Sequence, residues 1–195
     1  MDLAPLAEGT TSYNASWRDG DGSGKYYPKG WKRPTELTID EAIRMAPDMK
    51  RSAGNFTLGK YQFKAGALGD AKTRMNLSGD ELLSESMQDR IMRERLAYRG
   101  YDRFLAGALP IETFQKKLAK EWPSMGGAVG VKQYDGVRVR DPRTPAEVVR
   151  ATLEKARADA DVITNRYLED GRLPPERGRW REPSKASSPK APARR

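Results

Sequence analysis

The chain has 195 residues, enough for one domain of ordinary size, and carries 36 Lys and Arg against 27 Asp and Glu, a net charge of +9. It contains no His and no Cys, which excludes Ser-His and Cys-His catalytic pairs, His/Cys zinc sites, thiol redox centres and disulfides. In an enzyme of this composition, proton transfer falls to Asp, Glu, Lys or Tyr. Because no run approaches 18 apolar residues, we expect no membrane span.

The positive charge is concentrated at the C-terminal end of the sequence. Residues 172–195 hold eight basic residues, two acidic residues and five of the 13 prolines, whereas residues 1–171 have a net charge of only +3. A segment so rich in Pro, Ser and Arg, with few large apolar side chains, cannot offset the entropy lost on ordering. We therefore expect residues 1–171 to form the folded domain and residues 172–195 to form a disordered, basic, Pro-rich tail.

Apolar residues recur at helical spacing in five segments. The first begins at a capping box of Thr38 and Glu41 and has an apolar stripe ahead of Pro47. The second is expected from about Gln62 to Met75. The third segment has Leu83, Met87, Ile91 and Leu96 before Gly100. The fourth begins at Pro110 and carries Ile111, Phe114, Leu118 and Trp122 on one face. The fifth, over about residues 144–168, begins with Thr144-Pro145-Ala146-Glu147 and has a predicted buried side of Val149, Leu153, Ala156, Ala160, Ile163 and Tyr167.

Two polar, Gly-rich stretches separate these helices, and strand signals are weak. Irregular stretches longer than about 12–15 residues are usually functional or disordered, and the aromatic residues in both stretches argue against disorder. These aromatics are Tyr13, Trp17, Tyr26, Tyr27 and Trp31 in residues 9–34, and Tyr134 in residues 126–143. The predicted fold is mainly α (α+β), a helical domain in which two long aromatic, Gly-rich loops or a small hairpin border a cleft.

Two short segments carry residues suited to sugar chemistry. Glu8 ends a short apolar run and opens into a glycine-led loop, so burial at a cleft wall would raise its pKa and make it a general acid. The alternative is a surface glutamate. In Gly59–Phe63, the ring of Tyr61 and the amide of Gln62 suit sugars and their N-acetyl groups. The alternative there is a glycine turn followed by a buried tyrosine.

Together these segments resemble the lambda-type phage endolysins, which are lysozyme-superfamily muramidases and lytic transglycosylases that cut peptidoglycan. The resemblance extends from residue 6 to about residue 136, so the helix of 144–168 and the tail lie beyond it. The motifs that carry it, in chain order, are Glu8-Gly9-Thr10, Tyr13-Asn14, Gly59-Lys60-Tyr61-Gln62-Phe63, Ser86-Met87-Gln88-Asp89, Gly100-Tyr101-Asp102-Arg103-Phe104-Leu105 and Glu121-Trp122-Pro123-Ser124-Met125.

The resemblance implies a lysozyme-like fold and the role of catalytic glutamate for Glu8. It implies that Gln62, with Tyr61, holds the muramic acid residue of the substrate, and that Tyr13 and Asn14 line the cleft. Trp122 is expected in the core instead, because its spacing with the preceding apolar residues already explains it. We expect no cofactor and no bound metal.

A single well-placed acid, without a clear partner, favours lytic transglycosylation of the bond between N-acetylmuramic acid and N-acetylglucosamine, to which the resemblance also points. Glu8 would protonate the leaving oxygen and then accept the proton of the C6 hydroxyl as it closes on C1. A hydrolytic muramidase, the alternative, needs a positioned water and usually a second carboxylate. Asp19 and Asp21 in the first loop are possible second carboxylates, but residues 18–22 read equally well as a turn. These residues also lack the ligand spacing of a calcium loop.

A non-catalytic assembly or nucleic-acid-binding protein is the alternative of a different class, and the net charge and Arg-rich tail favour it. Because the sequence contains no DNA-reading motif, we expect peptidoglycan strands as the partner of the protein. We expect the basic tail to contact the anionic envelope or a partner protein. The expected site of action is the periplasm or cell wall. Residues 1–7 lack the features of a secretory signal, and both phage-type accumulation in the cytoplasm before release and export after processing stay open.

Overall fold

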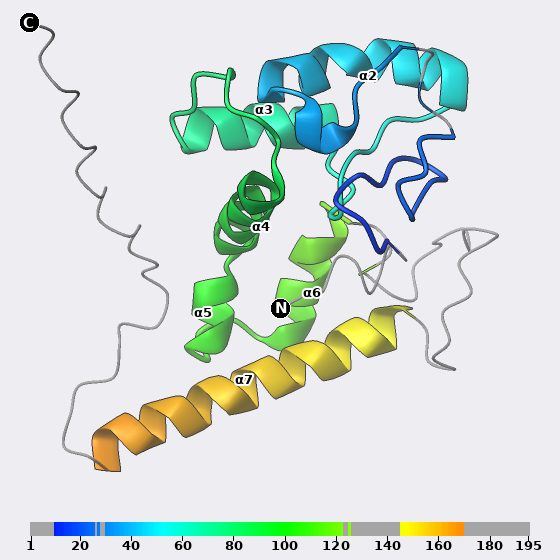
Figure 1. Ribbon diagram of the computed structural model, residues 1–195. Coiled ribbons are helices and arrows are strands. Elements are labelled where there is room, and N and C mark those ends of the chain that lie inside the picture. Colours follow the sequence, from blue (N-terminus) through cyan, green and yellow to red (C-terminus); the bar gives the residue numbers. More distant parts are fainter. Residues whose placement is uncertain (1–9, 26, 28–29, 123–124, 126–144, 170–195) are drawn as a thin grey trace, which may run out of the picture.

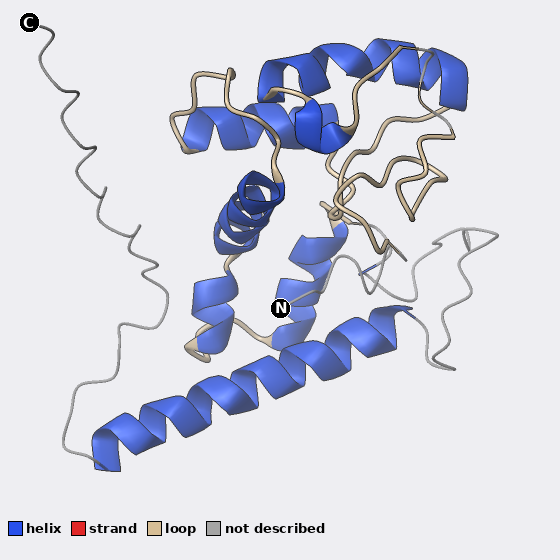
Figure 2. Ribbon diagram, viewed as in Figure 1, coloured by secondary structure: helices blue, strands red, loops and turns tan. Residues whose placement is uncertain are grey.

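The computed structural model describes residues 10–25, 27, 30–122, 125 and 145–169. Across these residues the chain is mainly helical, as expected, and its only β pairings are isolated bridges (Figures 1 and 2). The predicted loop 126–143 with Tyr134, Tyr26 and the predicted tail 172–195 lie outside the described residues. The helical elements are η1 (Pro34–Glu36), α2 (Ile39–Ala53), α3 (Ala65–Arg74), α4 (Glu85–Arg99), α5 (Tyr101–Leu105), α6 (Ile111–Ala119) and α7 (Pro145–Glu169).

Helix α2 begins at the predicted capping box but runs further than its first apolar stripe. The Thr38 hydroxyl accepts the N–H of Glu41 over 3.1 Å, and the Glu41 carboxylate accepts the N–H of Thr38 over 2.8 Å. The helix then continues through Pro47 to Gly54, which ends it in the left-handed conformation at φ 82°. Pro47 is exposed and Met49 beyond it is fully buried, so continued burial offsets the hydrogen bond that proline cannot make.

Helix α3 begins at Ala65, three residues later than the sequence predicts. Gln62 adopts a left-handed φ of 49°, and Lys64 is extended, so neither residue can be the first turn of a helix. Leu58 and Phe63 exchange backbone hydrogen bonds of 3.0 and 2.8 Å, which closes a tight turn over the residues between them. The Gly59–Phe63 segment is therefore a turn that ends before the helix.

Of the next three helices, α4 and α6 largely follow the prediction. Helix α4 begins after Ser84, whose hydroxyl accepts the N–H of Met87, and ends at Gly100 with φ 95°. The short helix α5 follows at once and was not predicted as a helix. Helix α6 ends at Ala119, so Trp122 lies past its end, although it is only 2% exposed, as expected for a core residue.

The helices pack as a series that brings one continuous core together. Helix α2 packs on α3, α3 on α4, α4 on α5 and α6, and these two on α7 (Figure 1). Phe104 of α5 and Phe114 of α6 stack at a centroid distance of 5.0 Å and belong to the same core as Val149 and Leu153 of α7, and all four are fully buried. The C-terminal half of α7 extends beyond α5 in Figure 1. None of the helices in the described ranges is long and apolar enough to cross a membrane.

The predicted buried side of α7 is only partly described. Leu153 lies on it as expected, and Ala156 and Ala160 are half-buried. The side chains of Ile163 and Tyr167 are outside what the structure describes.

Candidate active site

The segment that follows the predicted catalytic residue is held against the Gly59–Phe63 turn. Glu8 and Gly9 lie outside the described residues, and Thr10 is the first residue described. Thr10 is 6% exposed, and its hydroxyl donates to the carbonyl oxygen of Lys60 over 2.6 Å. A buried hydroxyl needs such a partner, so this bond fixes where the first loop begins.

Further along, the first loop runs beside the strand-like residues that lead into the turn. The N–H of Gly59 donates to the carbonyl of Ala15 over 2.8 Å, and the N–H of Trp17 donates to the carbonyl of Thr57 over 3.2 Å. Ala15 and Ser16 are buried at this contact. Their side chains are short, which lets the two backbones approach closely. Residues 10–17, which follow Glu8 in the sequence, are thus hydrogen-bonded to residues 57–60 at both their beginning and their end.

Gln88 on α4 joins these two segments, although no role was predicted for it. Its amide nitrogen donates to the carbonyls of Tyr13 and Leu83, each over 3.0 Å, and its amide oxygen accepts the N–H of Lys60 over 3.0 Å. The side chain is fully buried with its donors and acceptor in use. The sequence signal that could have indicated this role is the position of Gln88, a polar residue between Met87 and Ile91 on the apolar side of a predicted helix.

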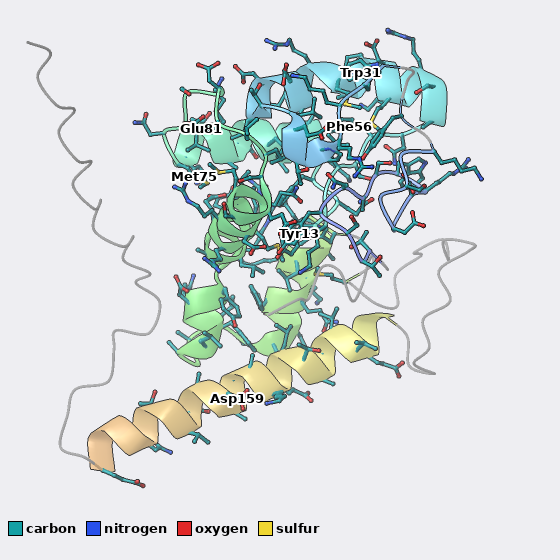
Figure 3. All side chains as sticks on the ribbon, viewed as in Figure 1. Tyr13, Trp31, Phe56, Met75, Glu81 and Asp159 are labelled. Carbon is teal, nitrogen blue, oxygen red and sulfur yellow. The ribbon has the colours of Figure 1, made fainter. Side chains whose placement is uncertain are left out.

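Two of the predicted contact residues, Tyr13 and Tyr61, meet at Asp89. Both hydroxyls donate to the same carboxylate oxygen, over 2.9 Å from Tyr13 and 2.6 Å from Tyr61. The rings lie edge to face with centroids 6.4 Å apart, and the Lys60 ammonium lies 4.8 Å from the centroid of Tyr13. Tyr61 is 4% exposed, whereas Tyr13, labelled in Figure 3, is half-buried and presents the larger surface.

Burial, followed by the hydrogen bond and the charge of Asp89, raises the pKa of Tyr13 above its usual value of 10.0. The Tyr13 phenol therefore stays protonated at neutral pH and donates to Asp89, which acts as an acceptor. Aromatic surface with a fixed hydroxyl, a carboxylate and an ammonium group suits a polar ligand with apolar faces, as a sugar has. Asp89 is the residue of this group to which sequence reasoning assigned no role.

The other two predicted contact residues, Gln62 and Asn14, have their side chains bonded inside the protein. The amide oxygen of Gln62 accepts the Thr57 hydroxyl over 2.6 Å, and its nitrogen donates to the carbonyl of Gly59 over 3.0 Å. The amide oxygen of Asn14 accepts the N–H and the hydroxyl of Thr35, over 3.1 and 2.8 Å. These two residues therefore shape the turn and the start of η1 rather than joining the Tyr13–Tyr61 pair.

Asp19 braces the first loop, in agreement with the prediction of a turn. Its carboxylate accepts the N–H and hydroxyl of Ser23 over 3.1 and 2.6 Å and the N–H of Gly24 over 2.7 Å. Burial by itself would raise the pKa of Asp19, but these hydrogen bonds outweigh it, so the pKa is lowered from the usual value. In the described part of the chain, no three acidic side chains are grouped so as to hold a metal ion.

A cavity of about 510 Å³ borders the same turn. Gln62, Phe63 and Trp122 contribute to its lining, and the Trp122 indole donates to the carbonyl of Tyr61 over 2.7 Å. The cavity and the Tyr13–Tyr61 pair thus share the backbone of residues 61–63.

Comparison with protein-family models, with curated proteins and with solved structures found no match in any of the three.

Proposed function

We propose that this protein is a peptidoglycan-cleaving muramidase of lysozyme-like fold that works as a lytic transglycosylase, with Glu8 as its acid and base. The observation that carries the proposal is the hydrogen bond from Thr10 to Lys60, which holds the loop after Glu8 on the Tyr-Gln turn. Glu8 precedes Thr10 by two positions in the sequence. The endolysin resemblance gives the same two segments the catalytic and muramic-acid-binding roles.

In this mechanism one carboxyl group serves two successive proton transfers. Glu8 donates its proton to the oxygen between N-acetylmuramic acid and N-acetylglucosamine as the C1–O bond breaks. The resulting carboxylate takes the proton from the C6 hydroxyl of the muramic residue while O6 bonds to C1. The products are a 1,6-anhydromuramic end and a free N-acetylglucosamine hydroxyl, and no water is consumed.

The described residues would bind and orient the glycan strand. Tyr13 offers an aromatic edge whose hydroxyl is fixed by Asp89, and such surfaces pack against the apolar faces of sugar rings. Lys60, above that ring, adds a positive charge next to an anionic strand. Gln62 and Tyr61 fix the shape of the turn beside the muramic residue, and Asn14 fixes the loop that carries Tyr13.

Clearing of purified peptidoglycan suspensions tests this proposal. Glu8→Gln removes the transferable proton with little change in size, and we expect the clearing rate to fall by about 100-fold or more, the usual contribution of a general acid. Glu85→Gln, at an exposed position of α4, is the matched control and should clear like the wild type. Equal clearing by wild type and Glu8→Gln would remove Glu8 from the mechanism.

A further inference from the structure

Tyr13, the more exposed tyrosine of the Tyr13–Tyr61 pair, is held at two points by helix α4. Its carbonyl oxygen accepts the side-chain amide of Gln88 over 3.0 Å, and its hydroxyl donates to the carboxylate of Asp89 over 2.9 Å. Gln88 and Asp89 are consecutive residues of the helix. One turn of α4 therefore fixes both the backbone and the ring of Tyr13.

The same two residues of α4 also hold the Gly59–Phe63 turn. The amide oxygen of Gln88 accepts the N–H of Lys60 over 3.0 Å, and the carboxylate of Asp89 accepts the hydroxyl of Tyr61 over 2.6 Å. Gln88 and Asp89 thus bind one backbone group and one tyrosine hydroxyl from each of the two segments. Asp89 is the residue that aligns the two rings.

The two tyrosines differ in what they can offer to a substrate. Tyr61 is 4% exposed, so it has almost no surface for a sugar to contact. Tyr13 is half-buried, and its ring meets the Tyr61 ring edge to face at a centroid distance of 6.4 Å. Tyr61 therefore serves as a buried anchor for the Asp89 carboxylate, and the exposed part of Tyr13 is the surface that can contact a ligand.

A ring that is fixed before the substrate arrives loses less freedom on binding. Ordering a mobile side chain at an interface costs binding free energy, and a side chain that is already held in place avoids most of that cost. The bond to Asp89 fixes the hydroxyl end of Tyr13, and the contact with Tyr61 supports its ring. Removal of the carboxylate would release both hydroxyls and leave the Tyr13 ring able to turn.

We infer that Asp89 is a positioning residue of the glycan site, which acts on the substrate through Tyr13 and has Tyr61 as its anchor. It sets the affinity for the glycan strand and takes no part in proton transfer, because its carboxylate is engaged by the two hydroxyls. This inference rests on the proposed function, since its ligand is the glycan strand of that site.

Titration calorimetry with soluble, uncross-linked peptidoglycan strands tests the inference. Glu8→Gln is the parent protein, so that affinity is measured without cleavage. Adding Asp89→Ala should weaken binding at least about tenfold, because the Tyr13 ring is no longer held in place. Asp89→Asn keeps an oxygen that accepts hydroxyl protons, so it should restore the affinity to within about threefold of the parent. Asp102→Ala, at a half-buried aspartate of α5, is the matched control and should bind like the parent.

Tyr13→Phe separates positioning from a general effect on the fold. This variant keeps the ring and removes the hydroxyl, so it breaks the same hydrogen bond from the other side. We expect it to weaken binding too, and we expect Asp89→Ala to add little, less than about twofold, when both changes are combined. A purely structural role of Asp89 would instead make the two losses multiply.

The inference would be overturned by parent-like binding of Asp89→Ala, by equally weak binding of Asp89→Asn and Asp89→Ala, or by losses that multiply with Tyr13→Phe. Equal weakening by Asp102→Ala would overturn it as well. Strands that bind the parent but are not cut by the wild type would overturn the cleavage proposal alone. The two proposals can therefore fail separately.

Discussion

The side-chain oxygen of Gln88 accepts the N–H of Lys60 and occupies the space that a Cβ atom at Gly59 would need. Gly59 also has φ 76°, a conformation that L side chains rarely adopt. Through its bond to Tyr13, the same amide fixes the first loop. One buried glutamine on α4 thus sets the relative position of the turn and of the loop that follows Glu8.

Gly59→Ala should therefore cost more stability than Gly54→Ala, measured as the free energy of unfolding in urea. Gly54 has a similar φ of 82° but open space where its Cβ would be, so it is a matched control for backbone strain. We expect a loss of about 1–2 kcal/mol at position 54 from the left-handed conformation. At position 59 the displaced Gln88 should add about 1–3 kcal/mol, the cost of unpaired buried polar groups. Equal losses at the two positions would contradict the Gln88 contact.

Asp89→Asn should lower the pKa of Tyr13 toward its usual value. Burial, the largest cause of the raised pKa, stays, but the negative charge of Asp89 is removed. The measurement is an alkaline titration followed by NMR of labelled tyrosine rings. Tyr101, whose pKa is raised to about 12 by burial and Asp102, should be unaffected and serves as the internal control. An unchanged Tyr13 titration would mean that its hydroxyl does not bond to Asp89.

Glu121→Gln should strongly destabilise the fold. Glu121 is 6% exposed at the side chain and balances Arg95, itself 3% exposed, so its removal leaves a buried guanidinium without its main partner. Breaking a buried pair in this way costs about 3–5 kcal/mol. Glu112→Gln removes a carboxylate that is 58% exposed and bonded to Arg150, and its effect in the same urea experiment should be far smaller. Comparable losses for both variants would be inconsistent with the buried pair.

The stabilising effect of Glu81 should depend on pH. Hydrogen bonds from its own N–H and from the N–H groups of Gly79 and Ser78 lower the pKa of Glu81 to about 2. Because the pKa of Glu81 is lower in the folded chain than its usual value of 4.5, the ionised carboxylate stabilises the fold at every pH above about 4.5. This stabilisation is lost as the pH falls from about 4.5 toward 2. The stability difference between wild type and Glu81→Gln should therefore be constant near neutral pH and shrink on acidification. A pH-independent difference in urea unfolding would rule out this role.

Features that depend on local sequence were predictable. The Thr38–Glu41 box and Gly100 mark a helix start and a helix end through contacts within one turn, and both lie where expected. The late start of α3 depends on the left-handed Gln62, whose turn is held by the distant Gln88. Such contacts form only when segments far apart in the chain pack together, so the local pattern did not contain them.

The difference between contacts within one turn and contacts between distant segments also applies to the candidate site. Tyr13 and Tyr61 were predicted as contact residues, and the structure brings them together, but the group that joins them is Asp89, separated from Tyr13 by 76 positions. Gln62 and Asn14 have side chains suited to sugars, yet the structure uses both internally. Residue type indicates what a side chain can bind, whereas the fold decides which partner it meets first.

Mass spectrometry of the soluble fragments released from purified peptidoglycan tests the central claim most directly. The proposed mechanism predicts fragments that end in 1,6-anhydromuramic acid from the wild type and none from Glu8→Gln. Fragments with reducing muramic ends would contradict transglycosylation and indicate hydrolysis. Anhydro fragments in equal amounts from both proteins would contradict catalysis by Glu8, and a wild type that releases no fragments would contradict the muramidase function itself.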